Sequence, residues 1–129
     1  MCVFETAYLK VCGSAFDLKQ VGDVYRHLSN YSLQKDNGEK TEELVMSSVQ
    51  FEEFMKSKIG PDFTWAKDML PKINDVVWRT LKSVQEPFEP KTNCFEVYGF
   101  DIVLDADLEP WVIEVNLSPA CNERTKWLS

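Results

Sequence analysis

The chain has 129 residues, of which 44% are apolar and 12% aromatic, a composition typical of one small globular domain and not of a disordered segment. Its 21 acidic and 14 basic residues give a formal net charge of −7, which argues against nucleic acid as the main partner. No apolar run reaches the roughly 18 to 20 residues that span a bilayer, and the N-terminus lacks a signal-peptide pattern. We therefore expect a soluble, cytoplasmic protein with no membrane partner, whose four scattered cysteines are reduced thiols.

The N-terminal third of the sequence predicts one strand followed by irregular structure. Apolar residues over 3–11 end at Gly13 and predict a strand that starts abruptly, so we expect Met1 to begin a fragment of a larger domain. Residues 17–35 mix apolar and polar positions without a clean period, and the polar run 36–43 predicts a loop.

Two helices are predicted in the middle of the chain. Ser47 and Gln50 match a capping box, and apolar residues at helical spacing follow them, so we expect a short amphipathic helix over 48–58. A longer apolar stripe over 64–85 predicts the strongest helix of the sequence. Pro71 is expected to lie in a first turn of this helix or to kink it.

The C-terminal part predicts a hairpin. Residues 94–104 and 111–116 are rich in β-branched and aromatic side chains and flank the turn sequence DADLEP. A symmetric turn would place Asp105 opposite Pro110 and so fix the pairing of the two strands.

With this pairing Asp101 lies opposite Glu114, and strand alternation places Val112, Glu114 and Asn116 on one face. Opposed carboxylates repel each other, and burying both is costly without a counter-charge such as a divalent cation. Two carboxylates and an amide carbonyl are oxygen ligands that Mg²⁺ prefers, although the residues alone equally allow a solvated acidic face of an edge hairpin. Gly99 on the same face either leaves room for a ligand or marks a bulge.

Two motifs carry a resemblance to a known family. VYGFDIVLDADLEPWVIEVNLSPAC resembles the closing motif of the tubulin tyrosine ligase-like family, and HLSNYSLQK at 27–35 resembles a second motif of that family. The resemblance covers nearly the whole chain but only the C-terminal part of the family's catalytic region. It implies an α+β fold, the C-terminal part of an ATP-grasp domain, in which an antiparallel sheet with a metal-binding hairpin is packed by two helices. Residues 1–129 would then form a single partial catalytic domain.

The resemblance also implies a cofactor site for ATP and Mg²⁺. Asp101, Glu114 and Asn116 are expected to be the Mg²⁺ ligands that hold the ATP phosphates. Asn30 is expected to contact the nucleotide as well.

The resemblance assigns catalytic positions near the N-terminus. Ser29 and Asn30 correspond to a pair beside the phosphates and the reacting amino acid, where a hydroxyl and an amide can bond phosphate oxygens, with loop capping as the alternative role. Lys10 stands where the family commonly has an arginine that clamps the carboxylate of the incoming amino acid, and lysine keeps the charge but loses the bidentate fork. We expect His27 to order this loop, and Lys35 either to reach a phosphate or an acidic peptide or to be a surface lysine.

The function that the resemblance implies is an ATP- and Mg²⁺-dependent ligase that adds glutamate or glycine to tubulin tails. Such enzymes activate a carboxylate to an acyl phosphate, which an amine then attacks. The expected partners are the C-terminal tails of tubulin or microtubules and an amino-acid substrate, in the cytoskeleton and including a cilium or flagellar axoneme. Because the chain and the tails are both acidic, a basic surface is expected either outside this sequence or around four lysines, namely Lys56, Lys58, Lys67 and Lys72.

Two other functions and the identity of the added amino acid stay open. The chain can be a truncated, catalytically inactive fragment that serves as a protein-binding module, or part of a different ATP-grasp ligase with a small-molecule acceptor. Residues 64–85 look closer to glycylating members of the family, whereas NLSP at 116–119 also suits glutamylating members.

Overall fold

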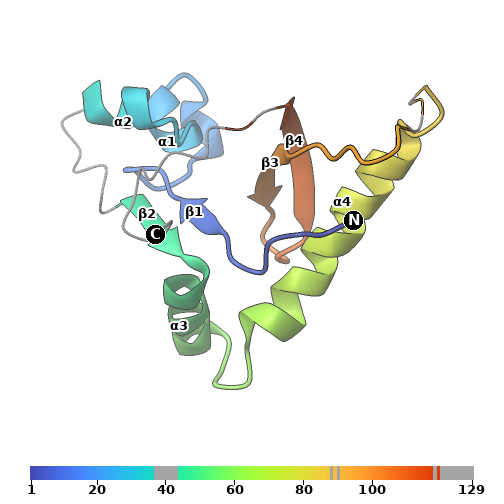
Figure 1. Ribbon diagram of the computed structural model, residues 1–129. Helices are drawn as coiled ribbons and strands as arrows, with labels where there is room; N and C mark the ends of the chain where they lie inside the picture. Colours follow the sequence, from blue (N-terminus) through green and yellow to red (C-terminus); the bar gives the residue numbers. More distant parts are fainter. Residues whose placement is uncertain (37–43, 88, 90, 118, 120–129) are drawn as a thin grey trace. The chain divides into compact units, whose positions relative to one another are not determined.

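The computed structural model describes residues 1–36, 44–87, 89, 91–117 and 119 (Figure 1). The chain divides into two compact units: Phe4–Phe63, and Thr64–Ser129 together with Met1–Val3. Both units contain helices and antiparallel strands, so the expected α+β class is confirmed. That residues 1–129 form a single partial domain stays a prediction. Of the loop expected over 36–43, residues 37–43 lie outside the described residues, and Asp36 is the last residue of a helix.

The strands of the unit Phe4–Phe63 form a short two-stranded ribbon. β1 (Tyr8–Lys10) pairs in antiparallel fashion with β2 (Val45–Ser47), and Leu9 lies opposite Met46. The strand predicted over 3–11 is therefore correct in place but too long, and β2 was not predicted. In Figure 1 the ribbon lies between α1 and α2 on one side and α3 on the other.

Short helices occupy most of the region that shows no clean apolar period. They are a 3-10 helix (Leu18–Gln20), α1 (Val24–His27) and α2 (Tyr31–Asp36). Asp17 and Asp23 cap the first two, because each carboxylate accepts a hydrogen bond from the main-chain N–H two residues on, at 2.9 and 3.1 Å. These two caps explain locally why two short helices begin within a few residues of each other.

The predicted capping box of α3 (Ser48–Lys58) is confirmed. Ser47 Oγ accepts from Gln50 N–H at 3.2 Å, and Gln50 Oε1 accepts from Ser47 N–H at 2.9 Å. The helix then buries an apolar stripe, in which Phe51 meets the Phe63 ring edge to face with centroids 6.2 Å apart. The buried apolar side chains described in this unit are Phe51, Met55 and Phe63.

The helix predicted over 64–85 begins with a π-helical turn (Trp65–Met69) and continues as α4 (Leu70–Ser83). Thr64 caps it, since its hydroxyl accepts from the N–H three residues on at 3.3 Å. Pro71 lies in the first turn of α4, where its missing N–H costs least. Met69, at the junction, is 0% exposed, and together with Trp65 and Val77 it forms the described core of this unit.

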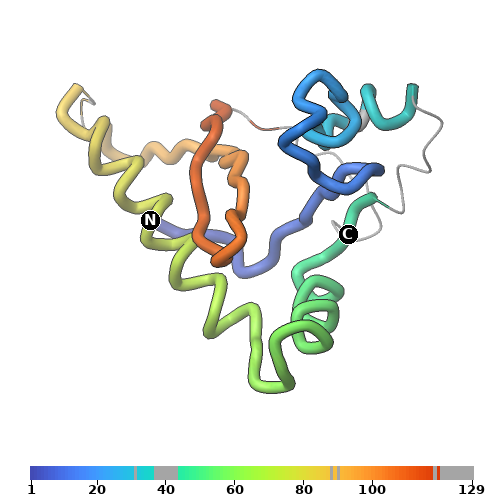
Figure 2. The backbone as a smooth tube through the Cα atoms, turned by 180° about the vertical axis from the view of Figure 1, so that it is seen from behind, coloured from blue at the N-terminus to red at the C-terminus, as the bar shows by residue number. Residues whose placement is uncertain are grey.

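The C-terminal strands form the predicted hairpin, β3 (Tyr98–Leu104) with β4 (Pro110–Leu117), and α4 lies alongside it (Figures 1 and 2). The strands described thus make two separate two-stranded sheets in place of the one sheet expected. Each sheet is packed by one helix: α3 on the β1–β2 ribbon and α4 on β4. None of the helices described is both long and apolar enough to cross a membrane.

Candidate functional site

The pairing predicted for the two carboxylates of the hairpin is confirmed. Asp101 lies directly opposite Glu114, and the next pair toward the open end of the same face is Gly99 with Asn116. The hairpin therefore brings the three predicted metal ligands together on adjacent positions of two strands.

The turn that leads to this pairing differs from the symmetric one expected. Leu104, and not Asp105, lies opposite Pro110, so the connection is longer by one residue on one strand. The register then shifts between Asp101 and Ile102, because Ile113 has no partner and forms a bulge. The bulge restores the expected carboxylate pair.

The same bulge corrects one prediction about faces. Val112 lies opposite Ile102, on the half-buried face of the hairpin, and not beside Glu114 as strict alternation predicted. The extra residue at Ile113 reverses the alternation on the turn side of the bulge. Trp111, opposite Val103, consequently shares the exposed face with the carboxylates.

Both carboxylates are solvent-exposed. The prediction that burial of the pair would demand a counter-charge was therefore wrong. Water and salt screen the repulsion between Asp101 and Glu114, so folding requires no counter-charge. Asn116 Nδ2 donates a hydrogen bond to Asp101 Oδ2 at 3.3 Å, which orients the amide on the carboxylate face. Its Oδ1 is left as an acceptor. Within the described residues no three His, Cys, Asp or Glu side chains form a metal-binding group, so an ion bound here would need an amide, water or phosphate oxygen as well.

The space at Gly99 is not open to a ligand. A Cβ atom at this position would lie 2.8 Å from Cβ of Pro119, and 3.8 Å from Cβ of Asn116. The bulge lies elsewhere, at Ile113. Gly99 is therefore explained by the close approach of Pro119, and neither reading given by the sequence was correct.

Asp105 organises the hairpin turn. Its carboxylate accepts hydrogen bonds from Trp111 Nε1 at 2.9 Å, from the main-chain N–H of Glu109 at 2.9 Å and from that of Asp107 at 3.0 Å. The pKa of Asp105 is lowered, first by the bond from Trp111 and then by the main-chain bonds, because all of them favour the ionised form. The turn also holds Leu108 at a φ of 59°, a left-handed conformation.

Lys72 attaches this turn to α4. Its Nζ donates to the carbonyl oxygen of Leu108 at 3.4 Å and forms an ion pair with Glu109. The sequence analysis missed the roles of Lys72 and Asp105, although an aspartate at the start of a hairpin turn is a recognisable signal.

The three residues predicted to be catalytic lie in the other unit. Lys10 is exposed on β1, with Nζ 5.6 Å from the centre of the Tyr8 ring. Half-buried Ser29 and exposed Asn30 lie between α1 and α2. In the part of the chain that the structure describes, neither side chain makes a hydrogen bond.

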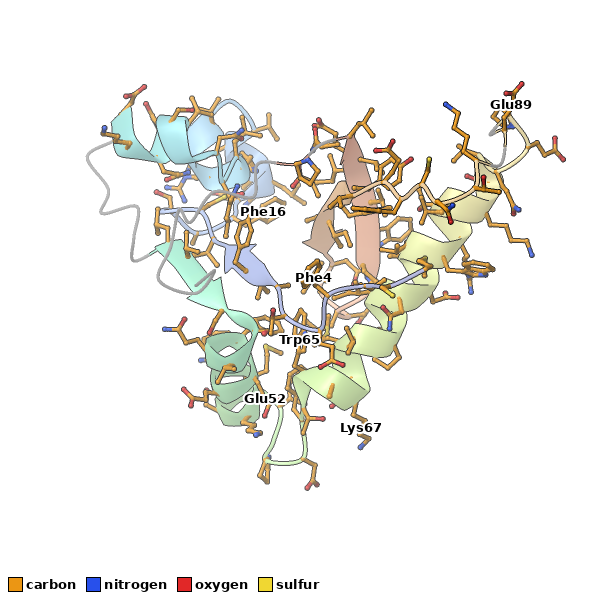
Figure 3. The ribbon with its side chains drawn as sticks, in the orientation of Figure 1. Phe4, Phe16, Glu52, Trp65, Lys67 and Glu89 are labelled. Atoms are coloured by element: carbon orange, nitrogen blue, oxygen red, sulfur yellow. The ribbon has the colours of Figure 1, made fainter. Side chains whose placement is uncertain are left out.

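His27 orders the loop, as predicted. Its Nε2 donates to the carbonyl oxygen of Gln20 at 3.1 Å, and its ring meets the edge of Phe16 with centroids 5.1 Å apart (Phe16 is labelled in Figure 3). Lys35 is exposed on α2. Gln34, which the sequence analysis did not single out, is buried beneath this loop and bonded to its main chain. Glutamine is ordinarily a surface residue, so the sequence alone did not indicate that Gln34 is buried.

Two of the four lysines named for a basic surface form ion pairs with glutamates. Lys56 pairs with Glu52 at 2.5 Å, and Lys72 pairs with Glu109. Lys58 lies 5.6 Å from the centre of the Phe54 ring, while Lys67 projects outward from the start of its helix (Figure 3). Lys56 and Lys58 belong to the unit Phe4–Phe63, and Lys67 and Lys72 belong to the other unit, so the basic surface stays a prediction.

Comparison with known proteins finds a matching family model and several similar proteins. Residues 2–129 match the model of the tubulin-tyrosine ligase family. The chain is 35% identical over 129 residues to tubulin glycylase 3F and 39% identical over 128 residues to tubulin glycylase 3E, both of Tetrahymena thermophila. It is 30% identical over 120 residues to the probable tubulin polyglutamylase TTLL9 of Bos taurus.

These alignments cover 98%, 98% and 92% of this chain but only 14%, 9% and 26% of the three relatives. The chain thus spans about a quarter or less of the length of these proteins. Because the family model matches residues 2–129, this chain belongs to the tubulin-tyrosine ligase family.

Proposed function

We propose that this chain is the C-terminal part of an ATP-grasp catalytic domain, in an ATP- and Mg²⁺-dependent ligase that adds glycine or glutamate to the C-terminal tails of tubulin. The observation that carries the proposal is the opposed pair Asp101 and Glu114 with Asn116 beside them. The names of the relatives, tubulin glycylases and a probable tubulin polyglutamylase, support the substrate.

The residues of the exposed hairpin face fit a magnesium ion that bridges to phosphate. All three supply oxygen donors, and the bond from Asn116 Nδ2 to Asp101 leaves Asn116 Oδ1 free to bind the ion. Bound there, Mg²⁺ would neutralise phosphate charge and align the phosphates for transfer. Asp101 and Glu114 would hold the ion, and the bond from Lys72 to the turn keeps the hairpin in place on α4.

Ser29, Asn30 and Lys10 are proposed to handle the anionic groups of the substrates. The hydroxyl and amide at 29 and 30 donate hydrogen bonds to phosphate oxygens and to the reacting amino acid, and Asn30 contacts the nucleotide. Exposed Lys10 pairs with the carboxylate of the incoming amino acid. In the reaction, the substrate carboxylate becomes an acyl phosphate with release of ADP, and the amine displaces phosphate to form the amide bond.

The first experiment measures Mg²⁺-dependent binding of a non-hydrolysable ATP analogue to the 129-residue chain by calorimetry. Glu114→Gln removes a direct ligand without changing its size, and we expect at least tenfold weaker binding, since even an outer-shell partner of a metal is worth about 10- to 100-fold. Glu53→Gln, the same substitution at an exposed position of α3, is the matched control and should bind as the unmodified chain does. Equal binding by both variants would refute the assignment of Glu114.

The second experiment measures incorporation of labelled glycine and glutamate into tubulin by the complete enzyme that carries this segment. Glycine is the donor we expect, because the two relatives named glycylases are more similar to this chain than the polyglutamylase. Loss of incorporation in Glu114→Gln but not in Glu53→Gln supports the ligase. Incorporation unchanged by Glu114→Gln, or modification of small amines in place of tubulin, would refute it and favour a binding module or another acceptor.

The proposed place of action is the cytoskeleton of the cytoplasm, including the axoneme of a cilium or flagellum. The names of the relatives, a tubulin glycylase and a probable tubulin polyglutamylase, support tubulin as the partner. A tagged protein that fails to localise with microtubules would contradict this part of the proposal.

A further inference from the structure

Gln34 is the most deeply buried polar side chain among the described residues, with 1% of its surface exposed. All of its side-chain hydrogen bonds go to the main chain. Nε2 donates to the carbonyl oxygens of Leu28 at 2.6 Å and Tyr25 at 3.1 Å, and Oε1 accepts from Gly13 N–H at 3.2 Å. Both N–H donors of the amide are therefore used, and the backbone segments that they join are held in place.

Two bonds from Gln34 enclose the segment Ser29–Asn30. The carbonyl oxygen of Leu28, immediately before the segment, accepts from the Gln34 side chain at 2.6 Å. The carbonyl oxygen of Asn30, at its end, accepts from the Gln34 main-chain N–H at 3.0 Å. A single residue thus bonds to the backbone on both sides of the two side chains that the proposed function assigns to the substrate anions.

The bond to Gly13 links this loop to the strand that carries Lys10. β1 continues beyond Lys10 by a bond from Val11 N–H to the carbonyl oxygen of Leu44 at 2.9 Å, and Gly13 follows two residues later. The Gln34 carboxamide is therefore a direct connection between the end of β1 and the loop before α2.

We propose that Gln34 is a positioning residue that sets where Ser29 and Asn30 lie relative to Lys10. The inference rests on the proposed function, which assigns the substrate anions to these three side chains. Glutamine is required for this role because the two carbonyl oxygens need N–H donors while Gly13 needs an acceptor. Methionine supplies neither, and glutamate supplies the acceptor but turns a carboxylate toward two carbonyl oxygens.

The test in the complete enzyme is a double-mutant cycle that joins Gln34→Met and Asn30→Ala. Rates of amino-acid incorporation into tubulin are compared at equal concentrations of folded protein. We expect each single variant to lower kcat/KM for the amino acid at least about tenfold, with KM for tubulin unchanged, and the double variant to be no worse than Asn30→Ala. Losses that multiply in the double variant would overturn the proposal, because they would mean that Gln34 does not act through the loop.

Gln50→Met is the matched control, since Gln50 also bonds a main-chain N–H in this unit but belongs to the capping box of α3. It should lower thermal stability and leave kcat/KM unchanged. If Gln34→Met does not fold, the cycle is run with Gln34→Glu, which keeps the size and the acceptor for Gly13. If neither variant folds, Gln34 serves the fold alone and the proposal is wrong.

A separate measurement distinguishes failure of this inference from failure of the proposed function. Amide hydrogen exchange of the 129-residue chain needs no activity, and Gly13 N–H is bonded to Gln34 Oε1. We expect Gln34→Met to accelerate exchange at Gly13 at least about tenfold, with no change in Gln50→Met. Unchanged exchange overturns the positioning role, whereas inactivity of the unmodified enzyme toward tubulin refutes the proposed function.

Discussion

Replacing Gly99 with alanine tests the packing of the carboxylate face. The new methyl group would lie 2.8 Å from Cβ of Pro119, whereas carbon atoms in contact are about 3.5–4.0 Å apart, so roughly 1 Å has to open. Because the ring of Pro119 is fixed to its backbone, the cost is that of overpacking, about 1–3 kcal/mol. Alanine also lowers the conformational entropy of the unfolded chain, which stabilises the folded state by about 0.4–1 kcal/mol. The free energy of unfolding should therefore fall by about 1 kcal/mol in total.

The assay is urea unfolding followed by tryptophan fluorescence, since Trp65, Trp78 and Trp111 all lie in the same unit as Gly99. With a slope of about 2 kcal/mol/M, the midpoint should fall by about 0.5 M. An unchanged or raised midpoint would refute the reasoning from Pro119.

Two glycines of the unit Phe4–Phe63 serve as comparisons, and unfolding of their variants is followed by circular dichroism. A Cβ at Gly22 meets nothing within 4 Å, so Gly22→Ala should be neutral or slightly stabilising. Gly60 has a φ of 145°, and Gly60→Ala should destabilise by about 1 kcal/mol or more through backbone strain.

Two further predictions concern the same unit as the hairpin. Met69→Ala removes a side chain that is 0% exposed and should lower the free energy of unfolding by about 2–5 kcal/mol, and a loss below about 1 kcal/mol in urea unfolding would contradict its place in the core. Asp105 has a lowered pKa in the folded state, so its contribution to stability is present above the pKa of an unfolded aspartate and is lost as the pH falls through the folded pKa. The stability difference between the unmodified chain and Asp105→Asn should therefore shrink in acid, and a difference that is constant with pH would exclude this role.

The carboxylate pair was predicted correctly although the turn was not. Asp101 lies opposite Glu114 because two departures cancel: the turn is one residue longer than the symmetric one, and the bulge at Ile113 takes up that residue. The longer turn has a local cause in the three bonds accepted by Asp105. The bulge has no such signal, since isoleucine is an ordinary strand residue.

Local signals explain which helices were predicted. The capping box at Ser47 and Gln50 and the apolar stripe of α4 act within a few residues, and both predictions are confirmed. Asp17 and Asp23 also cap their helices with a single side-chain bond each, but these helices are too short to show an apolar period. β2 depends on pairing with a strand more than thirty residues earlier, which no local pattern reveals.

The chemistry of a site and the means of holding it are encoded differently in this sequence. Asp101, Glu114 and Asn116 could be proposed from the sequence because metal binding restricts the residue types that can serve as ligands, and their role as ligands stays a prediction. Gln34 was not identifiable, because any buried group with two donors and one acceptor could hold the main chain at this point. Its importance follows from where Gly13, Tyr25 and Leu28 meet in the folded chain. Residues that act through hydrogen bonds to distant main-chain groups are therefore the ones for which the three-dimensional structure adds most to the sequence.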